Sequence, residues 1–115
     1  MYNIKVVIDK INNDNVNYEE LLFCLKQEKL GPVGIAIFKL IERKYDSEEI
    51  INRLVELSPL LTGHKFSGPY QFGHAAISLL FLINSNTSLS KYNEIYDTLN
   101  DSDKFLVDNF IKNYS

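Results

Sequence analysis

The chain has 115 residues, of which 45% are hydrophobic and 23% charged, and its net charge is −3 at neutral pH. This composition is typical of one globular domain (residues 1–115) with an apolar core, and the negative charge disfavours nucleic-acid binding, which needs a basic face. No apolar stretch approaches the ~20 residues that span a bilayer, no secretory signal is visible, and Cys24 is the only cysteine, so we expect a cytoplasmic protein.

The first eleven residues fit two patterns. Apolar side chains alternate along positions 2–8 as in a strand, yet Ile4, Val7 and Ile11 also share one helical face. Because a lone strand leaves its backbone groups unpaired, we predict a helix here, followed by a polar turn at 12–15.

Two helices are predicted next. Asn17 and Glu20 give an N-x-x-E start that resembles a capping box. We expect this helix to end near Leu30, because Gly31 is a typical stop and Pro32 is a typical first residue of the following helix. That following helix is predicted to extend to about residue 44.

The middle of the chain combines one helix with an irregular segment. Asp46 and Glu49 repeat the capping pattern for a helix that is expected to end at Ser58-Pro59. Residues 59–68 contain three helix breakers and are predicted to be irregular.

The most apolar helix is predicted to begin at Pro69 and to end near Ile83. Its apolar residues surround most of the helix circumference, as in the central helix of a bundle.

Two further helices complete the chain. A polar turn at 84–88 precedes a helix over 89–99, and Asp101 or Ser102 is expected to cap the last helix, whose apolar stripe includes Phe105 and Phe110. The predicted fold class is therefore all-α: a compact bundle of six to seven short helices in antiparallel hairpins, or the same hairpins stacked as a short solenoid.

The residues capable of catalysis form no convincing constellation. His64, Lys65 and His74 are the side-chain types used in metal-independent RNA cleavage, but their spacing is not diagnostic. We expect His74 to be a hydrogen-bonded core residue and His64 a loop residue. Cys24 lies on an apolar helix face and is predicted to be buried.

No metal or cofactor site is predicted either. One cysteine and two histidines match no zinc spacing. Asp101 and Asp103 imitate the start of a calcium loop, but Leu106 replaces the glycine and Lys112 the glutamate that such a loop requires.

Acidic residues are absent from positions 57–93 and then recur. The acidic segment, residues 92–115, is interpreted either as a solvated face or as a docking surface for a basic partner, whose opposite charge speeds association. Tyr92 and Tyr96 lie between the acids and are suitable anchors if they are not core residues. The candidate acidic residues are Glu94, Asp97, Asp101, Asp103 and Asp108.

Residues 59–70 form a second candidate surface. His64, Lys65 and Tyr70 are expected to project from this loop in one interpretation. In the other, the loop is a packed connection that Phe66 pins to the core.

The predicted helical hairpins, the N-x-x-E start at Asn17–Glu20 and the segment GPYQFGHAAISLLFLI (Gly68–Ile83) carry a resemblance to a known family. The chain resembles small all-helical immunity proteins of bacterial contact-dependent growth-inhibition and other polymorphic toxin systems. It is similar in particular to those that neutralise secreted ribonuclease domains. No compact motif defines these proteins, so the resemblance assigns no binding residue.

The resemblance implies a cytoplasmic antidote that occludes the active site of a cognate toxin, and the acidic segments are consistent with a basic, RNA-cleaving toxin. We expect the chain to have no enzymatic activity and neither nucleic acid nor a membrane as a partner. The alternatives are a helical adaptor that binds a host protein, and an enzyme that uses His64, Lys65 and His74.

Overall fold

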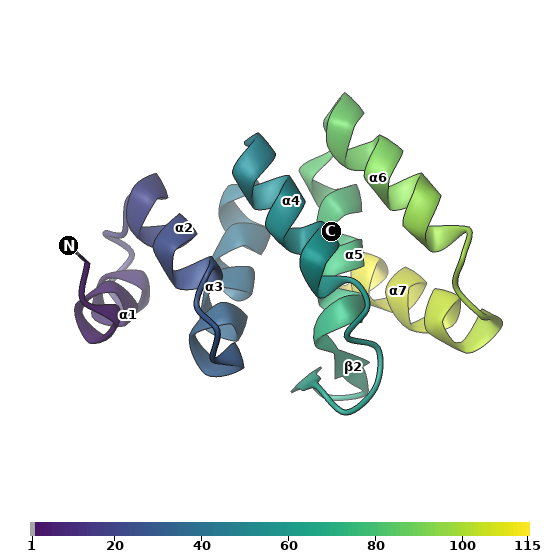
Figure 1. Ribbon diagram of the computed structural model, residues 1–115, viewed down its shortest axis with the longest axis horizontal. Coiled ribbons are helices and arrows are strands. Elements are labelled where there is room, and N and C mark those ends of the chain that lie inside the picture. Colours follow the sequence, from purple (N-terminus) through teal and green to yellow (C-terminus); the bar gives the residue numbers. More distant parts are fainter. Residues whose placement is uncertain (1) are drawn as a thin grey trace. The chain divides into compact units, whose positions relative to one another are not determined.

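The computed structural model describes residues 2–115, and Met1, which the predicted first helix included, lies outside the described residues. Seven helices and two very short strands make up this part of the chain, which confirms the all-α class (Figure 1). The chain divides into two compact units, an N-terminal unit (Met1–Arg43) and a C-terminal unit (Lys44–Ser115).

The N-terminal unit consists of α1 (Ile4–Asn12), α2 (Tyr18–Leu25) and α3 (Leu30–Arg43), which pack on one another. The predicted helix at the N-terminus is confirmed, and the side chain of Asn3 caps it by accepting hydrogen bonds from the backbone N–H groups of the first turn. The apolar core includes Val7, Ile11, Leu21, Leu25, Val33, Ile37 and Leu40.

The predicted junction between the next two helices is wrong. Helix α2 ends at Leu25, well before Leu30, and α3 begins at Leu30 and includes Gly31 and Pro32 in its first turn. Backbone N–H groups in the first turn have no helical acceptor, so proline costs little there. The Gly31-Pro32 pair therefore lies inside a helix start.

The capping box at Asn17 is confirmed. The backbone N–H of Glu20 donates to Asn17 Oδ1 at 2.9 Å, and the backbone N–H of Asn17 donates to Glu20 Oε1 at 3.0 Å. The buried Glu20 carboxylate also accepts a hydrogen bond from Lys10 Nζ of α1. The hydrogen bond from Lys10, followed by the one from the Asn17 backbone, lowers the pKa of Glu20.

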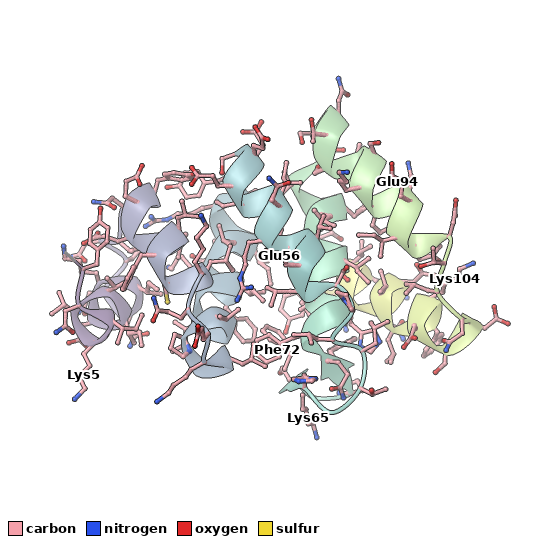
Figure 2. The ribbon with its side chains drawn as sticks, in the orientation of Figure 1. Lys5, Glu56, Lys65, Phe72, Glu94 and Lys104 are labelled. Atoms are coloured by element: carbon pink, nitrogen blue, oxygen red, sulfur yellow. The ribbon has the colours of Figure 1, made fainter. Side chains whose placement is uncertain are left out.

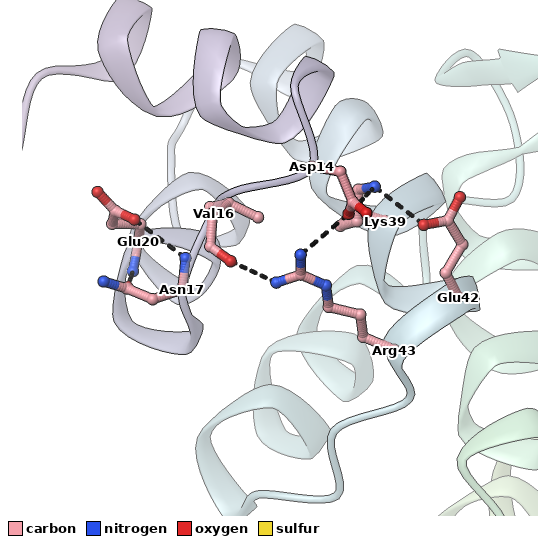
Figure 3. A network of polar contacts seen from close by, with 7 residues as sticks. All are labelled: Asp14, Val16, Asn17, Glu20, Lys39, Glu42 and Arg43. Carbon is pink, nitrogen blue, oxygen red and sulfur yellow. Dashed lines mark hydrogen bonds and ion pairs between the residues drawn. The ribbon is translucent and has the colours of Figure 1, made fainter.

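A polar network joins the turn after α1 to the end of α3 (Figure 3). Asp14 has a left-handed backbone (φ 56°), and its carboxylate accepts hydrogen bonds from Lys39 Nζ and an Arg43 nitrogen, both at 3.0 Å. Hydrogen bonds from these two cations lower the pKa of Asp14. Arg43 also donates to the backbone carbonyl of Val16, and Lys39 to Glu42, so the network ties the turn to α3.

The C-terminal unit is built around α5 (Phe72–Ile83), which packs against α4 (Glu48–Leu57), α6 (Asn86–Tyr96) and α7 (Asp101–Tyr114) (Figure 1). All residues of α5 are buried except Phe81. The expectation that the most apolar helix lies centrally is confirmed for this unit, because such a helix buries its whole circumference.

Four predicted helix starts in this unit need correction, and the first three are those of α4, α6 and α7. Ser47 caps α4 in place of Asp46, Ser85 caps α6 so that the helix begins at Asn86 and not at Leu89, and Asn100 caps α7 in place of Asp101 or Ser102. Each capping side chain accepts a hydrogen bond from the backbone N–H three residues later. Helix α6 ends at Tyr96, three residues before the predicted end.

The segment predicted to be irregular contains a two-stranded antiparallel sheet, β1 (Lys65–Ser67) and β2 (Tyr70–Gln71). Pro69 lies in the turn between the strands, so α5 begins at Phe72 and not at Pro69. The predicted end of the preceding helix at Ser58 is confirmed. Within residues 2–115, no helix combines the length and apolarity needed to cross a membrane.

Candidate protein-binding surface

The acidic side chains predicted to form a docking surface lie on α6 and α7 and at the junction between these helices. Four of them are exposed, namely Glu94, Asp97, Asp101 and Asp108. Figure 2 shows Glu94 on α6 and Lys104 near the start of α7, within the same C-terminal unit. The fifth, Asp103, is only partly exposed and has a structural partner, described below.

Tyr96 links the two helices. Its hydroxyl donates to the Asp108 carboxylate at 2.9 Å, and Lys104 Nζ lies 5.4 Å from the ring centroid. Burial and the hydrogen bond to Asp108 raise the pKa of Tyr96. Tyr96 is partly exposed and can contribute to a surface.

Tyr92 does not occupy the position expected for an anchor. It is 9% exposed, and its ring packs between Phe81 and Tyr96, at centroid distances of 5.1 and 5.2 Å. Burial, together with the neighbouring Tyr96 and Asp108, raises the pKa of Tyr92 to about 12. Of the two expected tyrosine anchors, only Tyr96 reaches the surface.

Asp103 and His74 form a pair between α7 and α5. His74 is 1% exposed, and its Nε2 lies 2.8 Å from Asp103 Oδ1. The backbone N–H of Gln71 donates to His74 Nδ1 at 2.9 Å, which assigns the ring proton to Nε2 as the donor to Asp103. The expectation that His74 is a hydrogen-bonded core residue is confirmed, and Asp103 is committed to this internal contact.

The strand segment that was a second candidate surface is packed onto the core. Phe66 contacts Phe72 edge-on at a centroid distance of 5.2 Å and also lies near Phe110. Tyr70 is buried, and its hydroxyl accepts a hydrogen bond from Asn113 Nδ2 at 3.1 Å. The interpretation as a packed connection is confirmed for these residues, and Tyr70 does not project.

His64 and Lys65 of this segment are exposed. His64 Nδ1 lies 2.9 Å from the carbonyl oxygen of Thr62, and its backbone N–H donates to Gln71 Oε1 at 2.7 Å. Both ring nitrogens of His74 contact other partners, so each histidine has its own local hydrogen-bonding role.

Cys24 is buried, as predicted, and its thiol donates to the carbonyl of Pro32. Burial raises the pKa of this thiol to about 11, which opposes formation of a nucleophilic thiolate. Among residues 2–115, no group of three or more histidine, cysteine, aspartate or glutamate side chains is placed to hold a metal ion.

Phe105 is one surface feature that the sequence prediction missed. It was expected in the buried stripe of the last helix, but it is 65% exposed, more than any other large apolar side chain described. The face of α7 that packs inward carries Asp103, Val107 and Phe110, which places Phe105 outward. The i, i+4, i+7 spacing of these three residues is that of one helix face, so the sequence already contained a sign of the inward face. The inward position of Asp103 became evident only from its pairing with His74.

A groove between α4 and α6 was also missed. It has a volume of about 430 Å³ and two carboxylates at its edge, and the residues that line it are Asp46, Glu48, Ile51, Asn52, Thr87 and Lys91. Most of the residues that line the groove come from two helices far apart in the sequence, and no local sequence pattern indicates that these helices lie side by side.

The excess negative charge belongs to one unit. The C-terminal unit has nine acidic and six basic side chains, whereas the N-terminal unit has six of each.

No family model matches the chain, and neither does any curated protein or solved structure.

Proposed function

We propose that this chain is an immunity protein that binds a cognate bacterial toxin domain, a basic ribonuclease, and neutralises it by covering its active site. It acts in the cytoplasm, without enzymatic activity of its own and without a nucleic-acid or membrane partner. The family resemblance supplies the biological setting, and the surface supplies the physical support.

The observation that carries the proposal is the exposure of four carboxylates on and between α6 and α7: Glu94, Asp97, Asp101 and Asp108. A ribonuclease must attract a polyanion, so its active-site face is basic. An acidic protein surface competes for that same face, and complementary charge speeds the encounter.

Growth rescue tests the proposal. The C-terminal domain encoded immediately upstream is expressed in a test bacterium, with and without this chain. Restored growth supports the immunity function. A toxic domain that this chain fails to neutralise, or a domain without toxicity, contradicts it and favours a helical adaptor.

Charge reversal tests whether the acidic surface attracts the toxin domain. Asp97→Lys with Asp101→Lys is expected to slow association with the toxin domain about tenfold at low ionic strength and to flatten its salt dependence. The matched control is Asp9→Lys with Glu28→Lys, which reverses two exposed carboxylates of the N-terminal unit. Equal association rates for both double variants would remove the acidic surface from the proposal.

A further inference from the structure

The outward side of α7 has an unusual composition. Phe105 is 65% exposed, and Asp101 and Asp108 lie four residues before and three residues after it, so both adjoin the ring on the helix surface. Lys112 is one turn further along the same side and is also exposed. These four residues are called the α7 outer face.

The fold does not require an aromatic ring at this position. Helix α7 is already anchored to the core by Val107 and Phe110, both fully buried, and by the contact between Asp103 and His74. A phenylalanine left in water forgoes part of its burial energy, which a partner can recover by covering the ring.

The charges around Phe105 select the kind of partner. Two carboxylates and one ammonium give the α7 outer face a net negative charge. A second copy of the chain, docked by twofold symmetry, would place two faces of the same net negative charge against each other. A basic partner meets opposite charge instead.

We infer that the α7 outer face is the docking surface for a basic protein domain that receives the Phe105 ring in an apolar socket edged by lysine or arginine. This rests on the proposed function and deepens it, because it identifies the part of the acidic surface that the toxin contacts. Phe105 supplies the buried anchor, while Asp101 and Asp108 orient the approach.

The test measures binding kinetics with the domain encoded immediately upstream, inactivated by substitution so that it can be purified. Phe105→Ala is expected to weaken binding about thirtyfold, mainly through faster dissociation, because a buried aromatic anchor is lost. Asp101→Lys is expected to slow association severalfold at low salt. Phe38→Ala is the matched control, since Phe38 is an exposed phenylalanine of the N-terminal unit (42% exposed), and it should change binding less than twofold.

The outcomes separate the two proposals. If the wild-type chain binds and rescues growth while Phe105→Ala binds equally well, the docking surface is wrong and the immunity function stands. If the wild-type chain neither binds nor rescues, both proposals fail. Sedimentation of the chain alone is the companion measurement, and a dimer that Phe105→Ala dissociates would overturn the inference in favour of a second copy.

Discussion

Replacing Gly73 by alanine tests how α5 is seated on the segment that follows α4. The second residue of α5, Gly73, donates its backbone N–H to the carbonyl of Leu60 at 2.8 Å. A Cβ atom at this position would lie 2.5 Å from the carbonyl oxygen of Ser58 and 2.9 Å from that of Leu60. These backbone oxygens are held in place by the chain, so they cannot move away from the added Cβ atom as the end of a flexible side chain can.

The expected change in the free energy of unfolding follows from one stabilising effect and two destabilising effects. Alanine in a helix gains up to about 1 kcal/mol over glycine. Overpacking of this severity costs ~1–3 kcal/mol, and displacing α5 to relieve it weakens the hydrogen bond to Leu60, which is worth about 1 kcal/mol. The steric effect dominates, and we expect Gly73→Ala to lower the free energy of unfolding by about 2 kcal/mol.

Thermal unfolding followed by circular dichroism measures this loss, which corresponds to roughly 8 °C for a chain of this size. The matched control is Gly31→Ala in the first turn of α3, where no atom lies within 4 Å of the added Cβ. Its melting temperature should equal or slightly exceed that of the wild type. If Gly73→Ala unfolds at or above the wild-type temperature, the close approach described for α5 is refuted.

Three other predictions concern buried or paired groups. His74→Ala leaves the Gln71 N–H without its acceptor and Asp103 without its donor, so urea unfolding should show a loss of about 3 kcal/mol, and a loss below about 1 kcal/mol would contradict the pairing. Cys24, with its thiol pKa raised to about 11 and its side chain buried, should react with iodoacetamide at about pH 8 at least ~100-fold more slowly in the folded protein than in denaturant, and equal rates would refute its burial. The pKa of Glu20 is lowered in the folded state, so its stabilising effect is complete above the ordinary value of 4.5 and is lost as the pH falls through the folded-state pKa. Glu20→Gln should therefore unfold more easily than the wild type at about pH 7 but not at about pH 2, and a difference that persists unchanged in acid would contradict this assignment.

Local signals in the sequence predicted the helices well where side chain and backbone interact over a few residues. The reciprocal hydrogen bonds of Asn17 and Glu20 are an example, because the capping box depends only on residues three apart. The apolar circumference of α5 likewise predicted its central position in the C-terminal unit.

Boundaries were missed where two local signals compete. Gly31-Pro32 is compatible with a helix end as well as a helix start. In the structure it belongs to a helix start, because the proline lies in the first turn of α3. Near Pro69, the pairing of Tyr70 and Gln71 with β1 holds the backbone extended and delays α5. Strand pairing of this kind depends on the partner segment, which a helical pattern does not reveal.

The candidate surface was predicted less well than the fold. The acidic residues were located from charge spacing, but the burial of Tyr92 and the exposure of Phe105 depend on how α6 and α7 are rotated against α5. For α7, the rotation places Asp103 beside His74, 29 positions earlier in the chain, and no local pattern predicts this contact.

Inhibition of the purified upstream-encoded domain is the decisive measurement for the proposed immunity function. Its RNA cleavage is followed while this chain is added in increasing amounts. We expect cleavage to fall to background at one equivalent of the chain, and the Phe105→Ala variant to be about thirtyfold less potent. Cleavage that continues at excess wild-type chain, or inhibition by far less than one equivalent, would contradict a stoichiometric antidote.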